Sequence, residues 1–308
     1  MNLCIYFEGT GQGVAGRITN VTRLRDACVE DARQKLHLEA GPGTRFGAYL
    51  SGKIAGVDWR GAFKDARRWF EASYESLPTD GIGTNVFLFG FSRGALLARH
   101  FAAWLDKLGV TVTYLGIWDT VDATVGLDVS EACPPNVIAA RHAVARDETR
   151  RFFQYVPLRS SHRRQVVEML FPGSHSDVGG LYDDNHLMAD LALAWIAAGA
   201  KRSGVRLRRG VRLVQRIDTQ AAVLHDSHGL VSNLWGAFKR VRRNVAGLRL
   251  HPAVDATRAG SIPGERALPR DGRVRRTRKM FKSKKENVND EANELLFSRC
   301  GVRGGDGG

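Results

Sequence analysis

The chain has 308 residues, of which 43% are apolar and 25% are charged, a composition that supports a sizeable core and excludes wholesale disorder. It has no run of about 20 apolar residues, the length a membrane-spanning helix needs, and its four cysteines form no CxxC pair, so an integral membrane protein, a disulfide framework and a zinc site are all disfavoured. The formal net charge is +14, which favours a polyanionic partner such as nucleic acid or an anionic membrane face.

The first half of the chain predicts strands and helices in alternation. Residues 3–7 are a short apolar run that ends in the glycine-rich segment 8–13, as a strand followed by a turn would. Residues 18–40 carry a mixed helical pattern that Gly-Pro-Gly at 41–43 would end. Apolar residues in 59–74 repeat at the spacing of one helical face.

The same alternation continues beyond this helix. Residues 85–89 predict a buried strand, and 94–108 predict an amphipathic helix ended by a glycine. Strands are then predicted at 110–118 and 166–171, and an apolar helix at 187–200. The alternation predicts an α/β fold with a mainly parallel sheet that helices cover on both faces.

The composition changes after residue 200. Residues 201–285 hold 23 Lys and Arg against 5 Asp and Glu, a net charge of +18, whereas the rest of the chain carries −4. Apolar residues at helical spacing in 230–241 predict a helix, which either lies in a membrane interface or packs on the domain with its cations outward. We expect 266–285 to be extended or mobile and 286–299 to form a short helix.

The strongest local signal is GFSRG at residues 90–94. It stands between a buried strand and an amphipathic helix, where the nucleophile elbow of a hydrolase must lie, because a tight strand–turn–helix needs glycines beside the serine. The alternative is a turn of small residues with packing value only. If the segment is a nucleophile elbow, Ser92 lies at the carboxyl edge of the sheet, beside a helix N-terminus that favours negative charge.

A serine nucleophile needs a base that a third group orients. Asp119 ends the strand after the elbow helix and is the candidate acid. Asp122 is a second candidate for this role, and either residue could instead only cap a turn. Of the nine histidines, His175 alone combines a place after a predicted strand, in a glycine-rich loop, with the chain order Ser, acid, His. The expected triad is therefore Ser92, Asp119 and His175.

Four segments together resemble the α/β-hydrolase family of type VI secretion phospholipase effectors, the Tle class. They are YFEGT at 6–10, GFSRGA at 90–95, GIWDTV at 116–121 and FPGSHSDVGG at 171–180, and a fifth, around 142–150, is also similar. Two positions depart from the family pattern: Glu8 stands where the family usually has Asp, and Leu181 where a third glycine is common.

The resemblance implies an α/β-hydrolase-like catalytic domain, which we place at 1–264, followed by a basic and partly flexible tail at 265–308. It also implies a lipase or phospholipase activity on glycerophospholipid esters, through Ser92, Asp119 and His175. The oxyanion donors would be the backbone N–H of Arg93 and a second group in the turn after the first strand, at Gly9 or Thr10. No motif asks for a metal or an organic cofactor.

The expected partners are a phospholipid substrate and an anionic membrane surface, bound peripherally through the basic segment. An effector of this class would also have an immunity protein. Because residues 1–7 lack the pattern of a secretory signal, we expect cytoplasmic synthesis, followed for an effector by delivery to the periplasm of a target cell. Two other hypotheses stay open: a catalytically silent relative that binds a polyanion through its basic region, and a nucleic-acid-binding protein on a hydrolase-like scaffold, which the lack of a recognisable reading motif disfavours.

Overall fold

The computed structural model describes residues 1–9, 18–41, 59–77, 83–121, 130–150, 153–160, 165–211, 213, 222–225, 243–245, 247–251 and 259–260. Several predictions of the sequence fall outside these residues: Thr10, Asp122, the helices at 230–241 and 286–299, the run 266–285, and the domain boundary at 264.

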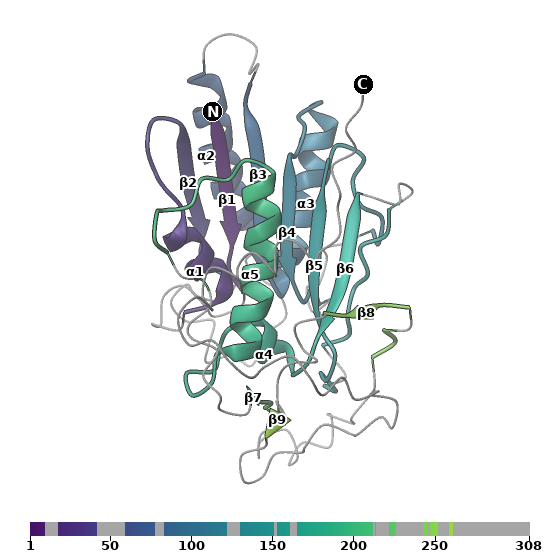
Figure 1. Cartoon of the computed structure of the whole chain (residues 1–308). Coiled ribbons are helices and arrows are strands. Elements are labelled where there is room, and N and C mark those ends of the chain that lie inside the picture. The colour runs from purple at the N-terminus through teal and green to yellow at the C-terminus, as the bar shows by residue number, and fades with distance from the viewer. Residues whose placement is uncertain are drawn as a thin grey trace, which may run out of the picture.

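Within the described residues, seven parallel strands form one sheet in the order β2-β1-β3-β4-β5-β6-β8 (Figure 1). The strands run so that their carboxyl ends meet at the lower edge in Figure 1. Their bounds are Asn2–Phe7 (β1), Gln34–Glu39 (β2), Asn85–Phe91 (β3), Tyr114–Trp118 (β4), Ala140–Ala145 (β5), Val166–Phe171 (β6) and Arg249–Leu250 (β8). A short separate pair joins β7 (Ala222–Val223) to β9 (Ala259–Gly260).

Helices cover both faces of this sheet (Figure 1). One face is packed by α1 (Asn20–Ala27) and α5 (Leu187–Arg202), with the short α4 (His175–Gly179) at its lower end. The other face is packed by α2 (Trp59–Glu75) and α3 (Arg93–Lys107). Among the described helices, none combines the length and apolar character needed to cross a membrane.

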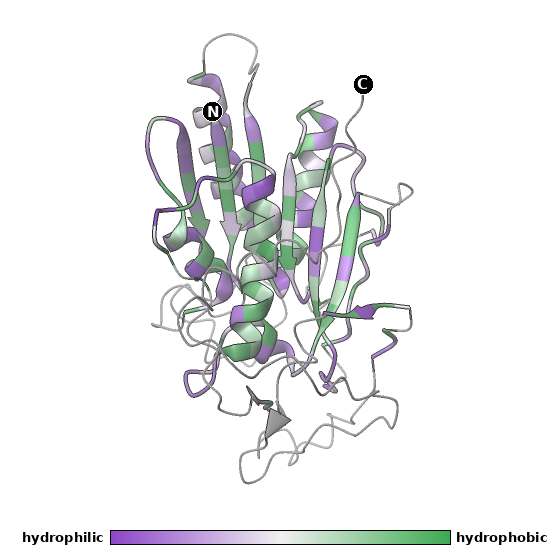
Figure 2. Ribbon diagram, in the orientation of Figure 1, coloured by the Kyte–Doolittle hydropathy of each residue, from purple (hydrophilic) through white to green (hydrophobic). Residues whose placement is uncertain are grey.

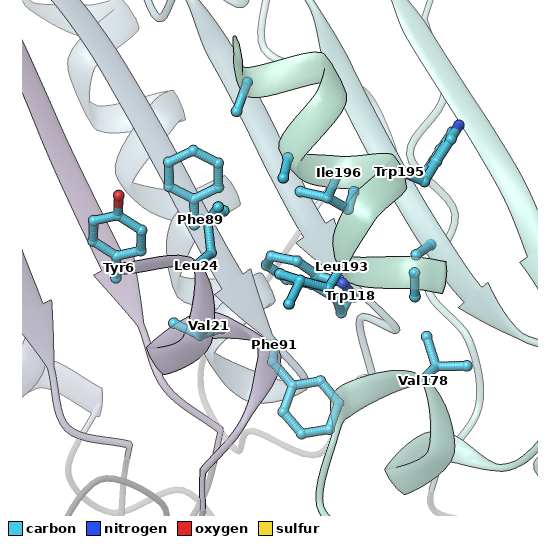
Figure 3. Packing of buried hydrophobic residues seen from close by; sticks show 14 of the residues in the cluster. Tyr6, Val21, Leu24, Phe89, Phe91, Trp118, Val178, Leu193, Trp195 and Ile196 are labelled. Atoms are coloured by element: carbon cyan, nitrogen blue, oxygen red, sulfur yellow. The ribbon is translucent and has the colours of Figure 1, made fainter. Parts of the chain in front are cut away.

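The two faces follow from side chains that alternate along each strand. In β1, Cys4 and Tyr6 join the core under α1 and α5, whereas Leu3, Ile5 and Phe7 join the core under α2 and α3. Figure 3 shows the first core, in which side chains of the sheet meet those of the three helices: Tyr6, Phe89, Phe91 and Trp118 from strands, and Val21, Leu24, Val178, Leu193, Trp195 and Ile196 from helices.

Strands covered on both faces read as nearly continuous apolar runs, as β1 and β3 do. Figure 2 shows green along much of these two strands, whereas β5 carries a hydrophilic stretch. Each large side chain buried in this way contributes about 1.5–3 kcal/mol to folding. Gly116 of β4 is required by the close approach of α5, since a Cβ there would lie 2.7 Å from Cγ2 of Ile196. The predicted α/β architecture, with a mainly parallel sheet between helical layers, is confirmed.

One predicted helix is wrong in extent. The segment 18–40 is helical only over α1, and its second half is the edge strand β2, which pairs in parallel with β1. The helix ends at Ala27, after which Cys28 takes an extended conformation. The chain then turns into β2 at Asp31, whose carboxylate accepts hydrogen bonds from the backbone N–H groups of Arg33 and Gln34. The period-2 pattern of Leu36 and Leu38 is the strand signal that the helical reading concealed.

Strand β5 was not predicted, because Arg141 and His142 interrupt its apolar run. Both side chains are buried and satisfied by distant partners. The Arg141 guanidinium donates to the backbone oxygen of Trp195, and the His142 ring lies 2.8 Å from a Glu168 oxygen while its other nitrogen accepts from the backbone of Thr120. Tertiary contacts of this kind override the local pattern.

Candidate active site

Ser92 forms the turn between β3 and α3, in a backbone conformation that side chains rarely adopt, with φ 60° and ψ −123°. Glycines make this turn possible. A Cβ at Gly90 would lie 2.4 Å from the backbone oxygen of Gly94, and a Cβ at Gly94 would lie 2.2 Å from that of Phe7. The GFSRG segment is therefore a strained strand–turn–helix at the carboxyl edge of the sheet, which is the geometry of a nucleophile elbow.

Asp119 and His175 meet at the same edge of the sheet. Asp119 directly follows β4, and His175 comes after β6 as the first residue of α4. The His175 Nδ1 lies 2.6 Å from the Asp119 Oδ2, and both side chains are buried. The backbone N–H of Ala145 donates to the Asp119 Oδ1 at 2.8 Å. The sheet thus places an acid and a histidine in direct contact although they are 56 residues apart.

His175 lies on a short helix rather than in the glycine-rich loop that the sequence suggested. The Asp177 carboxylate accepts hydrogen bonds from the backbone N–H and the hydroxyl of Ser174, at 2.7 and 2.9 Å, and so caps α4. The backbone N–H of His175 donates to the Glu148 carboxylate at 3.2 Å, and that of Gly173 donates to Asp147 at 2.7 Å. The backbone around His175 is held by carboxylates on both sides.

Aromatic rings hold the imidazole itself. The Phe91 ring stacks on His175 with centroids 4.5 Å apart, and the Phe153 ring meets it edge-on at 5.0 Å. Phe91 directly precedes Ser92, so the residue that packs against the histidine is the last of the strand that carries the serine. Helix α4 can approach because Gly179 has no Cβ, which would lie 2.1 Å from the Phe91 ring.

The surroundings lower the pKa of both members of this pair, for different reasons. Burial lowers the pKa of His175 below its usual range, although the hydrogen bond and the charge of Asp119 oppose this effect. Burial would raise the pKa of Asp119, but the Arg243 guanidinium and His175 hold it well below its usual range. Near neutral pH the site therefore contains an ionised carboxylate and a neutral imidazole, the states that a general base and its orienting acid require.

Arg243 is a residue of this site that sequence reasoning missed. Its guanidinium binds both oxygens of Asp119, at 2.6 and 3.0 Å. The local sequence, KRVRR at 239–243, gave the only signal, and a basic run is typical of exposed surface. Glu148 was missed as well: it lies in the fifth segment of the family resemblance, which assigned it no role.

The candidate oxyanion donors lie at the ends of β1 and β3. The backbone N–H of Arg93 belongs to the first turn of α3. The Arg93 side chain is itself buried, which lowers its pKa to about 10. The backbone N–H of Gly9 donates to the Glu8 carboxylate at 3.2 Å. Glu8 also accepts from the hydroxyls of Thr19 and Thr22. The assignments of Arg93, Gly9 and Thr10 stay predictions.

Burial raises the pKa of Glu8, although its hydrogen bonds from Thr22, Thr19 and Gly9 oppose the shift.

Among the described residues, no three His, Cys, Asp or Glu side chains are grouped as metal ligands would be.

The chain resembles several solved structures. The Tle1 effector bound to the VgrG spike of the type 6 secretion system is 19% identical, with a TM-score of 0.42, over 59% of this chain and 51% of that chain. An uncharacterised protein from Pseudomonas aeruginosa is 18% identical, with a TM-score of 0.44, over 68% and 46%. The RedJ thioesterase of Streptomyces coelicolor is 14% identical, with a TM-score of 0.38, over 62% and 89%. The chain spans about half the length of the first two structures.

None of the curated proteins matches the chain. A family model does: that of the catalytic domain of Tle1-like phospholipase effectors of the type VI secretion system matches residues 1–113 and 109–199. The matched region includes β1 to β6, the elbow at Ser92 and the contact of Asp119 with His175. The match extends over more than half of the chain, and the chain belongs to this family.

Proposed function

We propose that this protein is a serine hydrolase that cleaves carboxylic esters of phospholipids through Ser92, Asp119 and His175. The observation that carries the proposal is the buried 2.6 Å contact between His175 Nδ1 and Asp119 Oδ2, at the sheet edge where the strained turn presents Ser92. Family membership supports the choice of substrate class. The order Ser, Asp, His along the chain is also that of α/β-hydrolases.

In the proposed reaction, His175 acts first as base and then as acid. Its Nδ1–H is held by Asp119, so Nε2 accepts the proton of Ser92 while the serine oxygen forms a bond to the ester carbonyl carbon. The tetrahedral oxyanion collapses, the ester C–O bond breaks, and the leaving alcohol takes the proton from His175. Water, deprotonated in the same way, then cleaves the acyl-serine and releases a fatty acid.

The oxyanion would be bound by the backbone N–H of Arg93 and by a second donor at Gly9 or Thr10. Each such donor is worth about 3–4 kcal/mol in the transition state. In the resting structure the Gly9 N–H is engaged by Glu8, so its use would require that hydrogen bond to be exchanged for one to the oxyanion.

The proposed site of action is the periplasm of a target bacterium. We propose that the protein is delivered to the periplasm, binds an anionic membrane peripherally through cations of 201–285, and is neutralised in its producer by an immunity protein. Each Lys or Arg close to an anionic membrane would contribute about 1 kcal/mol to binding.

The proposal is tested with wild type and Ser92→Ala, on phosphatidylethanolamine–phosphatidylglycerol vesicles and on a soluble p-nitrophenyl ester. The variant should lose turnover by about 10⁴-fold or more on both substrates. Ser203→Ala, at the far end of α5 near the opposite edge of the sheet, is the matched control and should behave as wild type. Equal turnover by Ser92→Ala and wild type would overturn the serine mechanism. Vesicle binding without hydrolysis by either would favour the silent, polyanion-binding alternative.

A further inference from the structure

Arg243 lies outside the region that the family model matches, which ends at residue 199. It is nonetheless 1% exposed, against an Asp119 side chain that is 0% exposed. A guanidinium has five N–H donors. Nη1 contacts the Asp119 Oδ1 at 2.6 Å and the backbone oxygen of Ala145 at 3.1 Å, and Nη2 contacts the Asp119 Oδ2 at 3.0 Å. The Phe153 backbone oxygen accepts from Nε at 2.8 Å and also from Nη2, so five contacts account for five donors.

The carboxylate is equally occupied. Asp119 Oδ1 accepts from the backbone of Ala145 and from Arg243, and Oδ2 contacts His175 and Arg243. A carboxylate has about four lone-pair sites, and these four contacts use them. The planar fork of an arginine fixes both oxygens at once, which a single ammonium group could not do. The orientation of Asp119 toward His175 is therefore determined by the guanidinium as much as by the sheet.

We propose that Arg243 is a positioning residue of the catalytic site, which holds the Asp119 carboxylate in line with the His175 ring and cancels the negative charge of that carboxylate. The inference rests on the proposed function, in which Asp119 orients the general base. It assigns part of the basic C-terminal segment to the interior of the catalytic site, where it is unavailable to a polyanion.

The charges that surround His175 show what this cancellation does. Asp119 and Glu148 are the negative groups that contact it, and Arg150 pairs with Glu148 as Arg243 pairs with Asp119. Asp177, on the same helix, is directed to the cap of α4 and to His225. Each carboxylate that contacts His175 thus has its own guanidinium, and burial lowers the pKa of the imidazole although the hydrogen bond and charge of Asp119 and the charge of Glu148 oppose the shift. A neutral His175 can accept a proton at and below neutral pH.

Two substitutions separate positioning from charge. Arg243→Gln removes the positive charge, so the Asp119 carboxylate should stabilise the imidazolium more strongly and raise the pKa of His175 by about one unit. The acid limb of the kcat/KM profile should move to higher pH by the same amount, and kcat should fall by about 10²-fold as the carboxylate loses its fixed position. Arg243→Lys keeps the charge and loses the fork, so kcat should fall while the acid limb stays in place.

The readouts are the pH–rate profile on the soluble ester and the NMR titration of the His175 imidazole in the full chain, assigned by comparison with His175→Gln. Arg206→Gln, which breaks an exposed Arg–Asp pair with Asp31 near the amino-terminal edge of the sheet, is the matched control and should change neither readout. The titration does not depend on turnover, so it tests Arg243 even if the ester proves not to be a substrate, which would count against the proposed function alone.

An unchanged His175 titration in Arg243→Gln would overturn the role of charge, and wild-type kcat in Arg243→Lys would overturn the role of position. If Arg243→Gln fails to fold, Arg243→Lys still decides: an acid limb shifted by a full unit despite the retained charge contradicts the inference.

Discussion

Backbone strain in the described part of the chain is concentrated at the candidate triad. Leaving glycines aside, the described residues with positive φ are Ser92, at 60°, and Asp119, at 41°. Such conformations cost about 1–3 kcal/mol each and persist only where the surroundings enforce them. For Ser92 the enforcing contacts are those of the glycine-flanked turn, and for Asp119 they are the hydrogen bonds from Ala145, His175 and Arg243. Ser92 and Asp119 could be predicted as site residues because each directly follows a strand. Arg243 could not, because it lies in a run of basic residues and only the tertiary structure shows that this one is buried against Asp119.

The dependence between Asp119 and Arg243 gives a residue-scale prediction. Asp119→Asn should reduce kcat by about 10⁴-fold, because an amide cannot hold the required tautomer of His175. It should also destabilise the fold by about 3–5 kcal/mol, because the Arg243 charge is left buried without its partner. Urea unfolding and kinetics on the soluble ester measure the two effects.

The double variant Asp119→Asn with Arg243→Met separates them. It should recover most of the lost stability, since no unpaired charge remains, and none of the lost activity. Recovery of activity together with stability would mean that Asp119 serves only the fold.

At the scale of elements, the contrast between predicted and unpredicted segments has a physical cause. The strands β3, β4 and β6 were predicted from short, mostly apolar runs, and the helices α2 and α3 from apolar residues at helical spacing. Helix α5 was predicted from a longer apolar run. Strand β5 and helix α4 were not. The first contains buried polar residues with distant partners, and the second is a five-residue helix whose cap depends on Asp177 bonding back to Ser174.

The elbow gives a prediction at this scale. Gly94→Ala should lower stability markedly and abolish activity, because the added Cβ would meet the backbone oxygens of Phe7 and Glu8 at 2.2 and 2.4 Å, and backbone in the central sheet cannot retreat. Gly83→Ala is the control: its φ is +79° but nothing lies within 4 Å, so only the conformational penalty of about 1 kcal/mol applies. Thermal unfolding and ester turnover compare the two. Equal destabilisation would refute the close-approach argument.

At the scale of the whole molecule, described residues beyond 200 contact elements that lie within the region matched by the family model. Strand β8 pairs with β6, Arg243 binds Asp119, and His225 binds Asp177 of α4. The sequence predicted the charge of this region, but the contacts join residues more than 40 positions apart and leave no local pattern. Arg243 and His225, both from this segment, therefore lie at the same end of the sheet as Asp119 and His175.

His225 should make stability depend on pH. It lies between Asp177, 2.5 Å from Nδ1, and Asp184, 2.9 Å from Nε2, and stacks on Tyr182. Burial alone would lower its pKa, but the hydrogen bonds to the two carboxylates raise it to about 9. Because the folded pKa exceeds the unfolded value of about 6.5, the stabilisation is complete below that value and is lost as pH rises through about 9.

Urea midpoints measured from pH 6 to pH 10 test this dependence (a span chosen to bracket roughly both pKa values). Wild type should lose stability across the upper part of the range, and His225→Gln should show a flatter profile. A His225→Gln profile parallel to that of wild type would contradict the assignment.

The basic tail predicted at 265–308 gives the last prediction at this scale. A chain ending at residue 264 should bind anionic vesicles more weakly and with a smaller dependence on salt, since fewer cations would reach the surface. Its turnover of the soluble ester should be unchanged, because Arg243 is retained. Co-sedimentation at several salt concentrations measures the binding, and undiminished binding would show that the tail is not the anchor.

In the proposed function, His175, oriented by Asp119, activates Ser92 as a nucleophile. Intact-mass and peptide mass spectrometry after reaction with an alkyl fluorophosphonate tests it most directly, because such a reagent forms a stable bond to an activated serine. We expect one adduct per chain, mapped to Ser92, formed rapidly in wild type, slowly in His175→Gln and not at all in Ser92→Ala. Labelling of Ser92 at the same rate in wild type and His175→Gln, or an adduct on another residue, would contradict it.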